Sequence, residues 1–164
     1  MEKTLVVIKP DGVKRNLIGS IIKYYEDAGL KITKMEMTTL TKDFVSKHYP
    51  DTDDYCRSIG QKAKDAGNEV GNIIDYGRHI VKTLQDYLTE GPVIKMIIEG
   101  ENAVSEVRKV TGFTDPSQAD KGTIRGDLGE DSIAKANSEG RATKNLVHAS
   151  GNKEEAEAEI ELWL

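Results

Sequence analysis

The stretch Thr4-Leu5-Val6-Val7-Ile8-Lys9-Pro10-Asp11-Gly12 begins with a short apolar run and ends in a turn sequence. Large aliphatic and β-branched residues fill positions 4–8, and Pro-Asp-Gly is typical of turns. This pattern predicts a buried strand that leads into a tight loop. A lysine that leaves such a strand can face a ligand crevice, although turn chemistry alone also accounts for Pro-Asp-Gly.

Apolar residues recur at helical spacing after this turn, from Leu17 to Tyr25, and Gly29 supplies the stop. Further along we expect a strand over 31–40, a short helix capped by Thr41 or Asp43, a helix over 73–88, a strand over 93–98, a helix over 103–110, a short strand at 146–147 and a last helix capped by Asn152. Residues 51–72 and 113–128 lack a firm period. We expect a loop with one helical turn near 58–64 in the first segment and a long polar loop in the second.

The predicted order is strand, helix, strand, helices, strand, helix, loop, short strand and helix. Two βαβ halves in an antiparallel relation favour an α/β (α+β) sandwich of the ferredoxin-like type, βαββαβ, with a four-stranded antiparallel sheet covered by helices. A doubly wound sheet is the weaker alternative because only four strands are available. The length of 164 residues suits one domain, so we expect residues 1–164 to form a single folded unit.

The charge balance limits the kinds of ligand. The chain has 23 basic and 28 acidic side chains and a net charge of −5, which argues against specific nucleic-acid binding through bulk positive charge. An anionic ligand must therefore be held by a few cations gathered in one site. No apolar run approaches the roughly 20 residues of a membrane span, and the first strand begins too early for a signal peptide. The single cysteine, Cys56, excludes an intramolecular disulfide and fits a cytoplasmic protein.

Candidates for chemistry lie in the second loop and among three histidines. The loop contains Gly-Thr-Ile-Arg-Gly-Asp at 122–127, which by itself is more often a solvated loop than a phosphate clamp. His48 lies in the last turn of a helix, where the helix dipole favours it, and His79 is expected at the surface. His148 follows the apolar pair Leu146-Val147 and precedes small residues, which leaves its imidazole approachable. Spacing alone leaves both a structural and a catalytic role open for His148.

Six stretches together resemble one known family. They are, in chain order, Ile8-Lys9-Pro10-Asp11-Gly12-Val13, His48-Tyr49, Glu90-Gly91-Pro92-Val93, Gly122-Thr123-Ile124-Arg125-Gly126-Asp127, Asn145-Leu146-Val147-His148-Ala149-Ser150 and the terminal Glu159–Trp163. The sequence resembles the nucleoside diphosphate kinases over nearly its whole length, and Asn-x-x-His-x-Ser is the most specific element. The resemblance implies the ferredoxin-like fold. It also implies transfer of a γ-phosphoryl group from a nucleoside triphosphate to a nucleoside diphosphate, in two steps through a phosphohistidine.

The resemblance implies a role for each matching residue. His148 would be the nucleophile, oriented by Ser150 and Glu159. Lys9 and Tyr49 would contact the transferring phosphate, Arg108, Thr114 and Arg125 the remaining phosphates, and Asn145 with Lys9 the sugar hydroxyls. Mg²⁺ would be held mainly by the nucleotide phosphates, without a protein metal ligand. Simpler explanations exist for single residues, since Arg108 and Glu159 also fit solvated helix faces and Thr114 also fits the start of a turn.

The base contact departs from the family pattern. The family stacks the base on a phenylalanine in the helix pair before Gly-Pro, whereas this chain has Ile80 at that position, with Leu84 one turn on. Tyr76 or His79 can substitute as the base contact. Binding through phosphates, sugar and an apolar slot implies broad base selectivity.

Two segments, 51–78 and 129–141, are longer than in the compact family form. The first is expected to extend a helical hairpin. Gly151-Asn152 replaces the common Asp-Ser, which should alter helix capping more than chemistry. Family members assemble as hexamers or tetramers, so we expect a homo-oligomer, with a hexamer favoured.

Two classes of function follow from these residues. An active kinase, with nucleoside di- and triphosphates as its partners, needs His148 as nucleophile. A non-catalytic nucleotide-binding or regulatory module of the same fold would keep Lys9 and Arg125 but need neither His148 nor Glu159. The presence of all four residues favours the enzyme.

Overall fold

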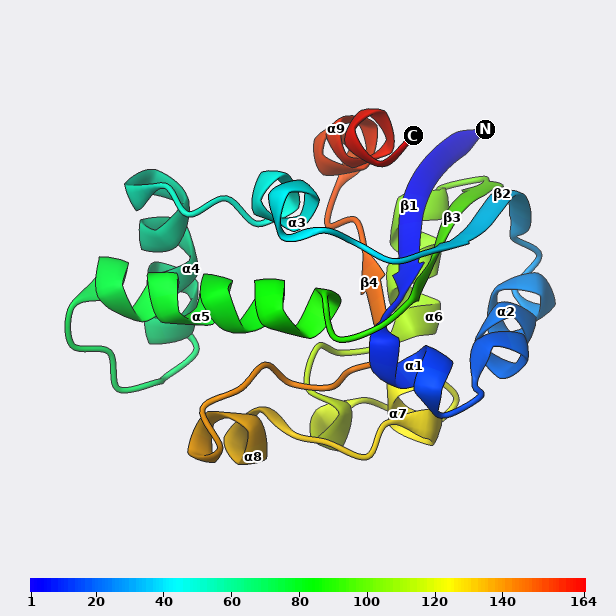
Figure 1. Ribbon diagram of the computed structural model, residues 1–164. Coiled ribbons are helices and arrows are strands. Elements are labelled where there is room, and N and C mark those ends of the chain that lie inside the picture. Colours follow the sequence, from blue (N-terminus) through cyan, green and yellow to red (C-terminus); the bar gives the residue numbers. More distant parts are fainter.

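A four-stranded antiparallel sheet forms the centre of the structure, a computed structural model that describes residues 1–164 (Figure 1). The strands are β1 (Glu2–Ile8), β2 (Lys31–Thr38), β3 (Val93–Gly100) and β4 (Val147–Ala149), in the spatial order β2-β3-β1-β4. Each neighbouring pair is antiparallel, and the three residues of β4 pair with the end of β1. The predicted ferredoxin-like sandwich is confirmed.

Helices cover both faces of this sheet. They are α1 (Pro10–Lys14), α2 (Ile18–Asp27), α3 (Lys42–His48), α4 (Asp53–Asp65), α5 (Ile73–Leu88), α6 (Ala103–Thr111), the 3₁₀ turn η1 (Pro116–Gln118), α7 (Ile124–Leu128), α8 (Ile133–Ser138) and α9 (Lys153–Trp163). Figure 1 shows α4 and α5 as a hairpin that extends away from the sheet. No helix is both long enough and apolar enough to cross a membrane.

The apolar run of β1 is explained by its central position. Side chains alternate along a strand, and here both faces are covered. Val6 and Ile8 belong to the core formed with α2 and α6, whereas Leu5 and Val7 belong to the core formed with α3, α5 and α9. A strand buried on both faces therefore has apolar residues at consecutive positions rather than at alternating ones.

The predicted loop at 51–72 is wrong over most of its length, because α4 is a helix of 13 residues capped by Thr52. Close contacts at two glycines explain why the hydrophobic period of α4 is weak. A Cβ atom added at Gly60 would collide with the carbonyl of Ile73, and one at Gly77 with the carbonyl of Cys56. The two helices of the hairpin thus meet backbone to backbone, so a broad apolar stripe is not needed to pack them.

Three further segments contain more helix than predicted. The loop over 113–128 includes η1 and α7, and the segment 129–141 includes α8. Pro10-Asp11-Gly12 begins the five-residue helix α1 instead of a tight turn, because proline is well suited to the first helical position. None of these elements is longer than six residues, which is too short to display a hydrophobic period.

Candidate active site

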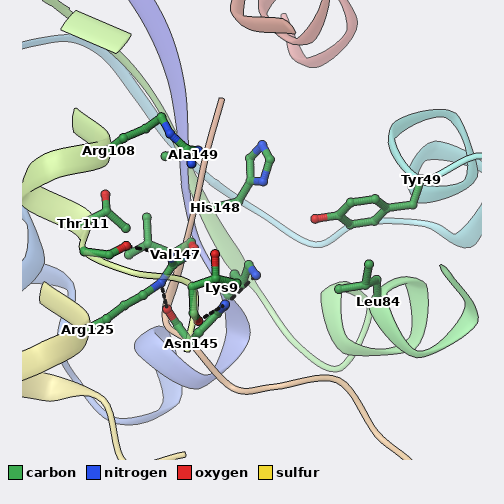
Figure 2. A pocket seen from close by; sticks show the side chains of 12 residues that line it. Lys9, Tyr49, Leu84, Arg108, Thr111, Arg125, Asn145, Val147, His148 and Ala149 are labelled. Carbon is green, nitrogen blue, oxygen red and sulfur yellow. Dashed lines mark hydrogen bonds between the residues drawn. The ribbon is translucent and has the colours of Figure 1, made fainter. Parts of the chain in front are cut away.

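A cavity of about 220 Å³ opens where β1 and β4 end and where α5, α6 and α7 converge. Its lining includes eight of the residues singled out from sequence: Lys9, Tyr49, Leu84, Arg108, Thr114, Arg125, Asn145 and His148. Figure 2 shows Tyr49 and Leu84 on one side, Arg108 and Arg125 on the opposite side, and His148 between them. Residues from distant parts of the sequence are thus brought to one place.

The imidazole of His148 is held from behind by a carboxylate. Its Nε2 lies 3.0 Å from both carboxylate oxygens of Glu159, and Ser150 Oγ donates to Glu159 Oε2 at 2.6 Å. Burial alone would raise the pKa of Glu159, but the hydrogen bonds from His148 and Ser150 lower it, so this group stays a carboxylate. A carboxylate accepts, so Nε2 carries the proton of the neutral ring. Nδ1 of His148 then retains the lone pair, and the ring lines the cavity.

Cationic groups surround the cavity at different depths. Lys9 is buried and donates from Nζ to Asn145 Oδ1 at 2.8 Å. Burial, followed by repulsion from Arg125, lowers the pKa of Lys9 from 10.5 to about 7. Arg125 is also buried, which lowers its pKa, whereas Arg108 is exposed at the rim. The acidic chain therefore gathers positive charge locally, as the charge balance required.

The loop before β4 is fixed by a buried carboxylate. Leu146 has a φ of +71°, a left-handed conformation that is rare for a non-glycine residue. Its N–H donates to Asp11 Oδ2 at 3.2 Å, and the hydroxyl of Tyr87 donates to Asp11 Oδ1. Arg125 donates to the carbonyls of Asn145 and Val147 on either side. These bonds set the position from which β4 presents His148.

His48, which belongs to the His48-Tyr49 stretch of the resemblance but was given no role, is a neighbour of the site. Its ring packs edge to face on His148 with centroids 4.7 Å apart, and Trp163 Nε1 donates to its Nδ1 at 3.2 Å. We expected the helix dipole to favour His48 at the end of α3, but burial has the larger effect on its charge. Burial lowers the pKa of His48 to about 3, with repulsion from His148 as the next cause, so the ring is neutral. An aromatic contact between residues 100 positions apart leaves no periodic signal in the sequence.

The remaining predicted residues are not part of the cavity lining. Ser150 and Glu159 stand behind His148, and the candidates Ile80, Tyr76 and His79 for the base contact are absent from the lining, which takes Leu84 from α5 instead. Thr111 lines the cavity but was not singled out. It lies three positions after Arg108 on α6, so helical spacing could have found it.

A comparison with known proteins gives the family. A family model described as nucleoside diphosphate kinase matches residues 2–56 and 74–164. The chain belongs to the nucleoside diphosphate kinase family. The part left out by the nucleoside diphosphate kinase model, residues 57–73, comprises most of α4 and its connection to α5, within the segment expected to be enlarged.

Individual relatives are similar over nearly the whole chain. A nucleoside diphosphate kinase from Pyrobaculum aerophilum is 42% identical, covering 99% of this chain and 94% of its own, and one from Pyrococcus furiosus is 40% identical, covering 99% and 83%. The crystal structure of an NDP kinase from Pyrobaculum aerophilum has a TM-score of 0.91 at 39% identity, covering 99% and 95%. A nucleoside-diphosphate kinase from Borrelia burgdorferi, solved as a transition-state mimic with vanadate and ADP, has a TM-score of 0.82 at 31% identity, covering 99% and 86%.

Proposed function

We propose that this chain transfers the γ-phosphoryl group of a nucleoside triphosphate, typically ATP, to a nucleoside diphosphate through a phosphohistidine on His148. The observation that carries the proposal is the orientation of that ring. Its Nε2–H is directed at the Glu159 carboxylate, and its Nδ1 lone pair remains available in a cavity with three cationic side chains. An oriented imidazole that presents a lone pair beside positive charge is suited to attack on a phosphate.

The reaction has two matching halves. Nδ1 of His148 attacks the γ-phosphorus in line, the bond from phosphorus to the bridging oxygen breaks, and the nucleoside diphosphate leaves. A second nucleoside diphosphate then attacks the phosphohistidine from the same position, which restores the neutral ring. Glu159 stabilises the positive charge that develops on the imidazole, and Ser150 holds the carboxylate in place. One site used twice implies ping-pong kinetics.

The other lining residues act on the phosphates and the sugar. Lys9 and Tyr49 contact the transferring phosphate, Arg108, Thr114 and Arg125 hold the remaining phosphates, and Asn145 with Lys9 meets the sugar hydroxyls. Neighbouring phosphate favours the charged form of Lys9, whose pKa of about 7 leaves it partly neutral beforehand. Nucleotide binding is therefore coupled to proton uptake by Lys9.

The side chains that line the cavity show whether the chain itself offers ligands for Mg²⁺. None of the side chains that line it is a carboxylate. Mg²⁺ prefers oxygen ligands and commonly binds through substrate phosphates with several waters, so it fits here as an ion carried by the nucleotide rather than by the chain. When bound, it would neutralise phosphate charge and orient the phosphate chain.

The base contact is the least defined part of the site. Leu84 is the side chain of α5 that reaches the cavity, and we propose that it, with Ile80 one turn away, forms an apolar face for the base. Tyr76 and His79 remain alternatives. An apolar face makes no hydrogen bond to a base, so selectivity among bases should be low.

Assembly and compartment complete the proposal. We propose a homo-oligomer, a hexamer rather than a tetramer, that works in the cytoplasm, where the buried thiol of Cys56 stays reduced. Exposed apolar side chains support an interface, since Met35 and Met37 on the edge strand β2 and Phe113 are each more than half exposed. Light scattering tests this, and a monomer mass would overturn it.

The decisive experiment is phosphorylation. Incubation with γ-labelled ATP should leave an acid-labile label on the wild-type chain and on His79→Gln, a matched change at an exposed histidine, but not on His148→Gln. An unlabelled wild-type protein that binds ADP would instead be the non-catalytic nucleotide-binding module. Formation of ADP from ATP with a second nucleoside diphosphate as acceptor distinguishes the two in solution.

A further inference from the structure

Three potential metal ligands meet behind the cavity. His48 from α3, His148 from β4 and Glu159 from α9 each offer one ligand atom, and these atoms lie within 4.8 Å of one another. All three side chains are largely shielded from solvent, with exposed fractions of 2% for His48 and 16% for both His148 and Glu159. They thus form a compact set rather than an exposed acidic cluster.

The composition of this set suits Zn²⁺. Two imidazoles and one carboxylate are a common protein ligand set for this ion, with an open fourth position. Zinc bonds of about 2.0–2.2 Å place neighbouring ligand atoms of a tetrahedron about 3.3–3.6 Å apart. Two observed spacings bracket that range, at 3.0 Å between His148 Nε2 and Glu159 Oε1 and 3.8 Å between His48 Nδ1 and the same oxygen. The third pair, the two histidine nitrogens, lies within 4.8 Å. Adjustments of a few tenths of an ångström bring the first two pairs to the required spacing, and the two histidine nitrogens must approach each other by up to about 1.5 Å.

His48 presents a lone pair to this set. Its Nδ1 lies 3.8 Å from Glu159 Oε1 and accepts the 3.2 Å hydrogen bond from Trp163, so the proton of the neutral ring is on Nε2. Nε2 is buried without a hydrogen-bond partner and is not the ligand atom. The hydrogen bond that a metal ion must displace at His48 is therefore the one from Trp163.

We propose that His48, His148 and Glu159 form a binding site for Zn²⁺ and that the occupied site prevents His148 from acting as the nucleophile; the second part rests on the proposed function. The ion takes the place of the proton between His148 Nε2 and Glu159 and replaces the Trp163 N–H at His48 Nδ1. A neutral imidazole that donates its Nε2 lone pair to a metal carries its proton on Nδ1. The atom that attacks phosphorus then has no lone pair.

Mg²⁺ does not compete for this set. It demands octahedral oxygen coordination, whereas two of the three ligands here are nitrogen atoms. The Mg²⁺ that accompanies the nucleotide and the inhibitory Zn²⁺ thus occupy different places. The site makes the enzyme sensitive to free zinc at ordinary magnesium concentration.

Direct binding is measured without nucleotide and without turnover. Trp163 is the only tryptophan, and it bonds directly to His48, so its fluorescence should change as Zn²⁺ is added and should not change with Mg²⁺. Equilibrium dialysis gives the stoichiometry, expected to be one ion for each chain. His48→Gln and, separately, Glu159→Gln should weaken the measured affinity at least about tenfold, because each removes one ligand.

Matched controls separate this site from others. His79→Gln removes an exposed histidine on α5 and Cys56→Ser removes the only thiol, and both should leave the zinc affinity unchanged. If His48→Gln is too unstable to study, Glu159→Gln alone carries the test, since Glu159 lies on the surface helix α9. Unchanged affinity in these ligand variants, or no saturable binding to the wild type, overturns the proposal.

Inhibition is tested separately from binding. Phosphorylation of His148 by MgATP should fall as Zn²⁺ saturates the fluorescence signal, and a zinc-selective chelator should restore it. Binding by a chain that shows no phosphoryl transfer would support the metal site and reject the proposed function. An active chain that binds Zn²⁺ at these residues yet keeps its full rate would overturn the inhibitory part.

Discussion

Asp11→Ala removes the carboxylate that holds the loop before β4. Asp11 accepts from the N–H of Leu146 and from the hydroxyl of Tyr87, and both donors belong to residues that are at most 2% exposed. Each buried donor left unpaired costs about 1–3 kcal/mol, so the variant should lose about 2–6 kcal/mol of unfolding free energy. Asp11→Asn keeps one acceptor oxygen and should lose about half as much.

Asp127 provides a matched control for this change. It also accepts from a tyrosine hydroxyl, that of Tyr24, and from a backbone N–H, that of Gly122, but it is exposed. Water replaces the lost acceptor there, so Asp127→Ala should cost much less than Asp11→Ala. Urea denaturation of the two variants and the wild type measures the difference. Equal losses at the two positions would refute the reasoning, because burial would then not determine the cost.

Activity should fall together with stability in Asp11→Ala. Without the carboxylate, Leu146 is free to leave its left-handed conformation, and the carbonyls that anchor Arg125 move with it. Misplacement of reacting groups by about 1 Å costs about a hundredfold in rate. The phosphorylation rate of His148, measured under conditions where the variant is fully folded, should therefore fall by about ten- to a hundredfold. A folded variant with the wild-type rate would show that this bond does not position the site.

Three further predictions follow from the same contacts. Gly77→Ala should destabilise the α4–α5 hairpin by about 1–3 kcal/mol, since the new Cβ meets a backbone carbonyl, whereas Gly19→Ala, with open space around it, should leave stability equal or slightly higher in the same denaturation assay. Glu159→Gln should slow phosphorylation of His148 by about a hundredfold or more while ADP affinity, measured by calorimetry, stays nearly constant, and equal loss in both would contradict an orienting role. Lys9 has a folded pKa of about 7 against 10.5 unfolded, so the unfolded chain binds more protons between these values and stability should rise with pH across that window. Lys9→Met should lack this rise, and parallel pH profiles for the two proteins would show that burial does not shift Lys9.

The sheet could be predicted from sequence because its two central strands, β1 and β3, have strong local signals, whereas β2 alternates only in part and β4 is three residues long. The run Leu5–Ile8 is apolar throughout and is followed closely by Pro10, and Gly29 follows the next helix. The helix α4 could not be predicted in the same way. Its packing depends on Gly60 and Gly77, which place two backbones in contact, and glycine is ordinarily evidence against a helix. The information for α4 thus lies in its partner rather than in its own sequence.

The residues of the cavity could be predicted only in part. Residues carried over by motif, such as Lys9, Arg125 and His148, line one cavity. No role was predicted for His48 because the importance of a buried histidine depends on what it touches, and the ring of His148 is 100 residues away in the chain. The base contact was uncertain for a different reason, since an apolar residue on α5 is explained equally well by packing.

Helix α9 explains how a chain with a net charge of −5 can have a cationic cavity, because it holds several of the acidic residues away from the cavity. Five glutamates lie on this helix, at 154, 155, 157, 159 and 161, and four of them are exposed. Glu159 alone is turned toward the sheet, where His148 and Ser150 donate to it. A carboxylate in that position does not repel the phosphates directly, because the imidazole lies between it and the cavity, yet it stabilises positive charge on the ring. Four of the five glutamates of α9 therefore lie in solvent, and in the proposed mechanism Glu159 makes the histidine a better nucleophile.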